Sequence, residues 1–155
     1  VMDEELTLVP RGGTPLLDAV GAALAKFAHF GERTVVMVIT DGQENESREW
    51  TKARVQALVK EREAVGWKML YLGANVDAFA EAGQAGIGAA GAICYAANAP
   101  STHAAYRSLG ANLRASAAAA SAGASWQAAA ANLTFTEAQR RAVIQPDDDD
   151  KEEKK

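Results

Sequence analysis

The first apolar positions of the chain repeat with a helical period. Apolar side chains recur at helical spacing over residues 16–27, which predicts an amphipathic helix. Thr14 is the expected N-cap of this helix, with Pro15 at its first helical position. Gly31 is expected to close it.

The next apolar runs alternate between strand-like and helical patterns. Residues 34–40 are an unbroken, mostly β-branched run, which predicts a strand buried on both faces, as in a parallel sheet. A charged helix is expected over about 48–65, a strand over 67–72, a short helix within 76–86 and a weaker strand over about 91–96. This alternation predicts an α/β, Rossmann-like three-layer domain with parallel strands.

The composition changes after Pro100. Residues 111–132 hold 12 alanines in 22 positions, which predicts one or two helices because alanine is the best helix former. Few large apolar groups occur there, so we expect this region to add little to the core. A final helix is expected after Thr136. These patterns divide the chain into a domain over 1–98, an Ala-rich helical extension over 99–146 and a disordered charged tail over 147–155.

Charge and composition exclude some classes of partner. The net charge is −4, and residues 147–155, with six acids and three bases, contribute −3 of it. The rest is nearly neutral and offers no basic surface for nucleic acid. No apolar run is long enough to span a membrane. Cys94 is the one cysteine and excludes an internal disulfide. These features favour a cytoplasmic protein.

Catalytic motifs are weak or absent in the sequence. Residues 86–91, "GIGAAG", match the spacing of a dinucleotide fingerprint, but a predicted helix precedes them and a predicted strand follows. The fingerprint requires the reverse order, so we interpret the stretch as a glycine-rich connection. His29 and His103 are far apart and have no metal-ligand spacing. No set of acid, base and nucleophile is visible, so we do not expect an enzyme.

Two oxygen-bearing side chains remain as candidates for a ligand site. Asp41 follows the strand predicted over 34–40, and Thr14 follows Gly12 and Gly13 at the start of a helix. In open α/β sheets, ligands bind at the carboxyl ends of the strands. Hydroxyl and carboxylate oxygens are ligands that Mg²⁺ prefers. A purely structural interpretation is also open, in which Thr14 caps a helix and Asp41 begins a turn.

The segments around these two residues resemble a known family. "PRGGTPLLDAVG" (10–21) followed by "VVMVITDGQEN" (35–45) is similar to the von Willebrand factor type A (VWA) domain, and the resemblance extends over about residues 10–98. It is most similar to the intracellular bacterial and phage members. Thr14 matches the threonine of the second loop of the family's metal-ion-dependent adhesion site, and Asp41 matches the aspartate of the third loop.

The resemblance implies a function and a partial metal site. Thr14 would be a direct ligand, Asp41 a direct or water-mediated one, and Gly12 and Gly13 would allow close approach of the backbone. The Asp-x-Ser-x-Ser motif of the first loop does not occur in this sequence, so we expect Mg²⁺ to bind weakly or not at all. The implied function is protein binding. The alternative is a structural or assembly protein, for example of a phage or prophage particle, that uses its Ala-rich helices.

The resemblance also implies that the strand beside 34–40 in the family is absent from this chain. Residues 34–40 contain no charge or proline that would protect an exposed strand edge. We therefore expect the chain not to be a stable monomer. Another polypeptide, a second copy, or an N-terminal or C-terminal segment of the same chain would cover this strand.

Overall fold

The computed structural model of the protein describes residues 12–145. The predicted disorder of 147–155 lies outside these residues. The described elements, in chain order, are α1 (Leu16–Lys26), β1 (Val35–Thr40), α2 (Lys52–Ala64), β2 (Lys68–Ala74), α3 (Ala78–Gln84), the 3₁₀ helix η1 (Ala89–Gly91), β3 (Ala92–Tyr95), α4 (Ala99–Ser121), α5 (Trp126–Ala130) and α6 (Glu137–Ile144).

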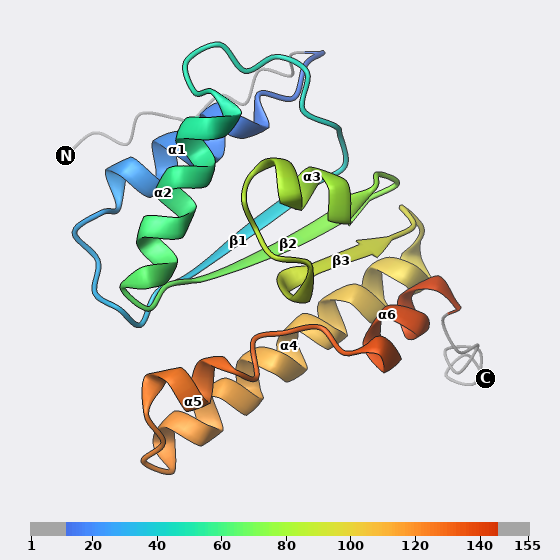
Figure 1. Cartoon of the computed structure of the whole chain (residues 1–155). Helices are drawn as coiled ribbons and strands as arrows, with labels where there is room; N and C mark the ends of the chain where they lie inside the picture. Colours follow the sequence, from blue (N-terminus) through green and yellow to red (C-terminus); the bar gives the residue numbers. More distant parts are fainter. Residues whose placement is uncertain (1–11, 146–155) are drawn as a thin grey trace, which may run out of the picture.

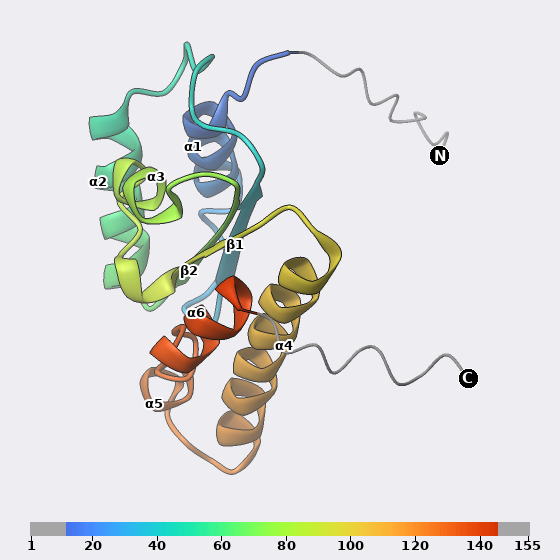
Figure 2. The same ribbon diagram turned by 90° about the vertical axis from the view of Figure 1, so that its right-hand side faces the viewer.

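The strands form one parallel sheet between two layers of helices. Their order is β1-β2-β3. Val36 pairs with Met69 between β1 and β2, and Leu72 pairs with Ile93 between β2 and β3. Helices α1, α2 and α3 lie on one face of the sheet, whereas α4, α5 and α6 lie on the other (Figures 1 and 2). The predicted α/β, Rossmann-like class of fold is confirmed.

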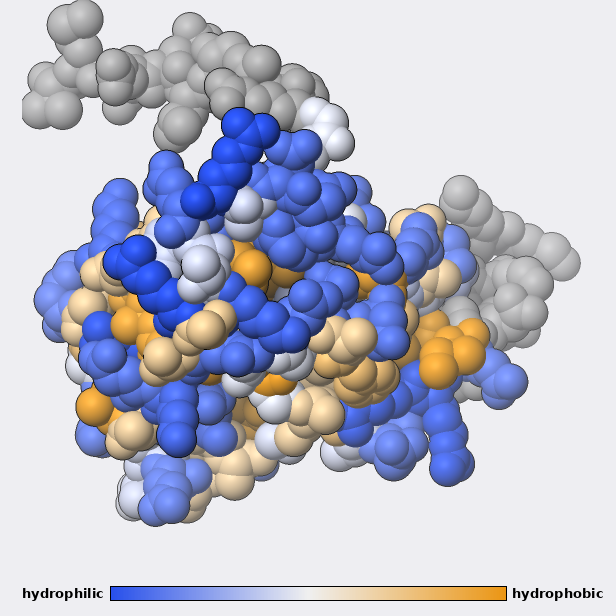
Figure 3. Space-filling model, turned by 45° about the horizontal axis from the view of Figure 1, so that its top comes forward, coloured by the Kyte–Doolittle hydropathy of each residue, from blue (hydrophilic) through white to orange (hydrophobic). Residues whose placement is uncertain are grey.

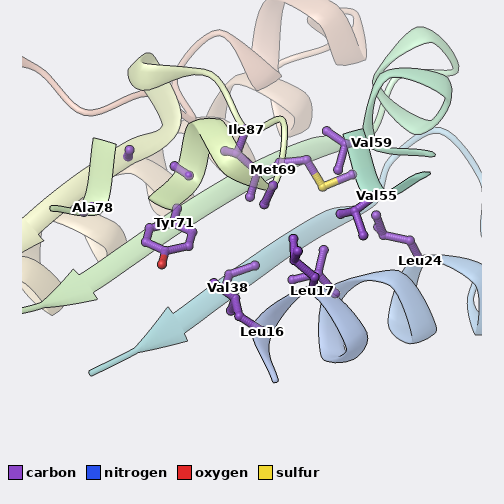
Figure 4. Close-up of a cluster of buried hydrophobic side chains, with 14 of the residues drawn as sticks. Leu16, Leu17, Leu24, Val38, Val55, Val59, Met69, Tyr71, Ala78 and Ile87 are labelled. Carbon is purple, nitrogen blue, oxygen red and sulfur yellow. The ribbon is translucent and has the colours of Figure 1, made fainter. Parts of the chain in front are cut away.

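Each face of the sheet has its own apolar core. The first core joins the sheet to α1, α2 and α3 (Figure 4), and its largest members include Leu16, Leu24, Val38, Val55, Met69 and Tyr71. The second core joins the sheet to α4, α5 and α6, and it includes Leu70, Leu72, Ile93, Leu109, Leu133, Phe135 and Val143. Residues 111–132 contribute few large side chains to this core, as expected, whereas residues on either side of them, Leu109, Leu133, Phe135 and Val143, contribute large ones. Ala104 and Ala105 are buried in α4, because small side chains let this helix approach the strands closely.

The ends of α1 differ from the prediction. Its N-cap residue is Pro15, without a side-chain cap, so Thr14 does not cap it. The amide of Thr14 instead donates to Asn45 Oδ1 (2.8 Å). The helix ends at Lys26, well before Gly31, and the side chain of Phe27 is exposed.

Side-chain caps set the starts of later helices. Helix α2 begins at Lys52, four residues after the predicted start, because the hydroxyl of Thr51 accepts a hydrogen bond from the amide of Arg54. The predicted cap of α6 is confirmed: Thr136 and Gln139 form a reciprocal capping box. The stretch from Gly86 to Gly91 connects α3 to β3. This agrees with its interpretation as a glycine-rich connection.

Strand β1 is less buried than predicted. Val38 packs into the first core, but on the opposite face Met37 is 42% exposed and Ile39 is 47% exposed. Helices α4 to α6 pack over β2 and β3 on that face, and no described segment covers the outer half of β1.

Candidate functional site

The carboxyl end of β1 meets the segment that precedes α1. The amide of Thr14 donates to Asn45 Oδ1, and the amide of Asn45 donates to the carbonyl of Thr14 (3.3 Å). Thr14 Oγ1 lies so close to Gly42 that a methyl group on Gly42 would clash with it. The structure therefore brings the Thr14 hydroxyl beside the residue that follows Asp41, although Thr14 and Asp41 are 27 positions apart in the sequence.

Asp41 is exposed at the same end of the sheet. Its negative charge acts on the hydroxyl of Tyr95, the last residue of β3. The pKa of Tyr95 is raised mainly by burial of its hydroxyl, then by the neighbouring Tyr106, and then by Asp41. Asp41 thus lies near the ends of both outer strands. No hydrogen bond within residues 12–145 uses its carboxylate or the Thr14 hydroxyl.

The loop between β1 and α2 is held in shape by the carboxylate of Glu44. It accepts hydrogen bonds from the amide of Leu17 (2.7 Å), from the hydroxyl and amide of Ser47 (2.6 and 2.8 Å) and from the amide of Glu46 (3.0 Å). Partial burial raises the pKa of Glu44, but these hydrogen bonds outweigh it and the net pKa is lowered.

Asp18 on α1 holds the next part of the same loop. Its carboxylate accepts from three consecutive amides, those of Arg48, Glu49 and Trp50, at 2.7–2.9 Å. The hydrogen bond from Arg48 is the main cause of a lowered pKa of Asp18. Asp18 and Glu44 together tie residues 44–50 to the first turn of α1.

Two polar side chains, those of Glu81 and Tyr71, are buried beneath this loop. Glu81 of α3 is 6% exposed and accepts from the amide of Glu44 (3.2 Å) and from the side chain of Gln84 (3.0 Å). Burial, and secondarily the charge of Glu81, raise the pKa of Tyr71 to about 12. The Tyr71 hydroxyl is buried without a hydrogen-bond partner among the described residues. Glu81 therefore supports the loop from inside the molecule.

Sequence reasoning identified Thr14 and Asp41 but missed Asp18, Glu44 and Glu81. Asp18 follows two buried leucines in α1, where an acid in a first helical turn has a routine explanation in the helix dipole. Glu44 belongs to a polar loop, whereas Glu81 belongs to the Ala-rich helix α3. The hydrogen bonds that join them to other elements have partners 27 to 37 positions away, Leu17 for Glu44 and the amide of Glu44 for Glu81, and no local signal marks these. His29 and His103, which lacked metal spacing, are both exposed.

The free oxygens at this end of the sheet fit Mg²⁺ only in part. Thr14 Oγ1 and the Asp41 carboxylate are hard donors, and the glycine at position 42 leaves room for the hydroxyl. The carboxylates of Asp18 and Glu44 are engaged by amides of the loop. Two protein oxygens with several waters would complete a Mg²⁺ shell and hold the ion weakly.

The surface around this loop is predominantly hydrophilic, with scattered apolar patches (Figure 3). Among residues 12–145, none of the helices is both long enough and apolar enough to cross a membrane.

The fold and this edge of the sheet place the protein in the α/β class. No protein-family model matches the chain, and no curated protein or solved structure shows significant similarity to it.

Proposed function

We propose that the chain is a protein-binding module of the VWA type, with a partial metal-ion-dependent adhesion site formed by Thr14 and Asp41. The observation that carries the proposal is the contact between the Thr14 segment and the residues after β1, because it joins the two loops that resemble the family. Mg²⁺ held there would offer an open coordination position to an acidic group of a protein partner, in the cytoplasm of a bacterial or phage-infected cell.

Binding is favoured over catalysis by the engagement of the other acids. The carboxylates of Asp18 and Glu44 accept hydrogen bonds from backbone amides of the loop and of α1, so among the described residues these two acids are not available beside Asp41 for acid-base chemistry. The alternative function, assembly through the Ala-rich helices with a vestigial metal site, would have to use the outer side of α4, since its inner side packs in the second core.

A Mg²⁺ titration followed by amide chemical shifts tests this function. We expect weak binding, with a dissociation constant of about 1 mM or above because two protein ligands hold this ion poorly. The largest shifts should occur around Thr14 and Gly42. Thr14→Val and Asp41→Asn should each abolish the response. Glu49→Gln, which removes an exposed carboxylate of the same loop, should retain it.

Two results would contradict the proposal. A Mg²⁺ response that persists at the wild-type size in both Thr14→Val and Asp41→Asn would place the ion elsewhere. Binding tighter than about 10 µM would require ligands beyond these two residues.

A further inference from the structure

Strand β1 has an unpaired edge in the described part of the chain, since the order of strands is β1-β2-β3. The amide of Lys68 donates to the carbonyl of Thr34 (2.9 Å), so Thr34 turns its backbone groups toward β2. Backbone groups alternate along a strand. The N–H and C=O groups of Val35, Met37 and Ile39 therefore point away from β2, toward the open edge.

The same three residues place apolar side chains on the uncovered face. Met37 and Ile39 are exposed there, and Val35 is half-buried. No lysine, proline or bulge interrupts β1, although natural proteins commonly use such features to protect an edge strand. This edge can accept another strand, and its side chains specify which one.

The sequence from Arg33 to Asp41, "RTVVMVITD", is self-complementary when read antiparallel about Met37. On the exposed face, Arg33 would be opposite Asp41, Val35 opposite Ile39, and Met37 opposite Met37. On the other face, threonines would pair with threonines and valines with valines. We propose that two copies of this chain pair antiparallel through β1 about a twofold axis at Met37, which joins their sheets into one.

The backbone supports the same register. In an antiparallel pair, the residues that exchange hydrogen bonds lie directly opposite each other. Val35, Met37 and Ile39 all direct their N–H and C=O groups outward, and this register places each of them opposite another member of the set. A shift by one residue would oppose an outward-facing residue to an inward-facing one and lose these bonds.

Charge complementarity selects a second copy as the occupant. Arg33 and Asp41 lie just outside the two ends of β1 and are both exposed, and the twofold axis brings each toward its opposite charge in the other copy. Cross-strand ion pairs and apolar pairs both stabilise such an arrangement. A contact of one strand from each copy is smaller than a standard interface of about 800 Å² per partner, so we expect dissociation in the micromolar range.

The proposed metal function uses Thr14, whereas the pairing of two copies does not. Asp41 belongs to both. Thr14→Val therefore separates them: it should remove the Mg²⁺ response and leave the dimer unchanged, whereas a defect in β1 pairing should do the reverse.

Disulfide trapping tests the register in the full chain with Cys94→Ala as background. Met37→Cys should form a covalent dimer on oxidation, since facing residues lie about 5.5 Å apart between Cα atoms, within the range of a disulfide. Ile39→Cys is the matched control: its two copies would be separated by about 14 Å along the strands and should not link. Val35→Cys combined with Ile39→Cys should link again.

Charge variants test the pairing without covalent trapping. Met37 is 42% exposed, so Met37→Lys and Met37→Glu should each fold, as checked by circular dichroism. Each should weaken its own dimer by about tenfold, because like charges face each other at the axis. An equimolar mixture of the two variants should restore the dimer in analytical ultracentrifugation.

Four outcomes would overturn the proposal. One is a monomer at every concentration up to about 500 µM, far above the expected range. Another is linking of Ile39→Cys as readily as Met37→Cys. The third is a wild-type dimer that Met37→Lys does not weaken. A monomer whose Val35, Met37 and Ile39 amides resist hydrogen exchange would also reject the second copy, in favour of cover by the same chain.

Discussion

At the scale of single residues, the loop after β1 depends on two carboxylates that act as acceptors. Residues 41–50 have no regular secondary structure. The carboxylates of Glu44 and Asp18 accept hydrogen bonds from backbone amides of this loop and of α1, which would otherwise need water. Hydrogen bonds of amides to a charged acceptor are stronger than those to a neutral one. The shape of the loop over residues 44–50 therefore relies on the ionised state of these two acids.

The lowered pKa values predict a loss of stability in acid. A carboxylate whose pKa is lower in the folded state stabilises the fold above its unfolded pKa, about 4 for Asp and Glu. That contribution is lost as the pH falls through the lower folded values of Asp18 and Glu44. We expect the free energy of unfolding from these groups to be constant from pH 7 to about 5 and to fall below about pH 4, as measured by urea unfolding at each pH.

A variant and a control separate this effect from general acid denaturation. Glu44→Gln should cost about 1 kcal/mol at pH 7, at the low end for hydrogen bonds to charged groups because the loop is partly exposed to water. The cost should shrink below pH 4. Glu49→Gln removes a carboxylate that holds no described amide, and it should leave the acid profile unchanged. Equal acid profiles for Glu44→Gln and the wild type would contradict this explanation.

The site could be predicted from the sequence only where its residues carry a local signal. Asp41 follows an apolar run and Thr14 follows two glycines, so both stand out from their neighbours. The partners of Asp18 are three backbone amides about 30 positions away. Nearly every residue type has the same backbone amide, so no pattern of side chains predicts which amides Asp18 binds.

At the scale of elements, periodicity predicted the order of helices and strands, but contacts between elements set their ends. Helix α2 starts late because Asp18 holds the amides of Arg48, Glu49 and Trp50 in the loop. The two faces of β1 could not be distinguished, because its apolar run looks the same whether one or both faces are covered. The contribution of α4 was missed because its buried residues are small.

Two helical glycines should respond oppositely to substitution by alanine. Gly21 of α1 lies against the ring of Trp50, so a methyl group there would displace the indole. Gly110 of α4 has only the flexible end of Arg114 nearby (3.3 Å). Gly110→Ala should stabilise the protein by about 0.5–1 kcal/mol through helix propensity. Gly21→Ala should destabilise it by about 1–3 kcal/mol through overpacking.

Chemical unfolding of both variants measures the difference, and Trp50 gives a local check. Its indole N–H resonance should shift in Gly21→Ala and stay constant in Gly110→Ala. A gain of stability in Gly21→Ala would show that Trp50 moves aside without cost, and that its packing against α1 does not hold the loop.

At the scale of the whole molecule, the central strand β2 depends on both layers of helices. Its side chains alternate between the two cores, with Met69 and Tyr71 in the first and Leu70 and Leu72 in the second. Residues 99–145 are therefore part of one folded unit with the strands. Trp126 of α5 strengthens this link, since its indole donates to the carbonyl of Gly66 just before β2 (2.6 Å).

Removal of the Ala-rich region should unfold the remainder. A chain that ends at Asn98 would expose Leu70, Leu72 and Ile93, which are all fully buried in the second core. Each such side chain contributes roughly 1.5–3 kcal/mol, so the loss is about 4.5–9 kcal/mol against a typical total of about 5–15 kcal/mol. A chain that ends at Gln145 keeps every residue of both cores and is the matched control. We expect cooperative thermal unfolding and dispersed amide resonances for the control, and neither for the shorter chain. A cooperative transition in the chain that ends at Asn98 would show that the first core suffices, and that residues 99–145 form a separable extension.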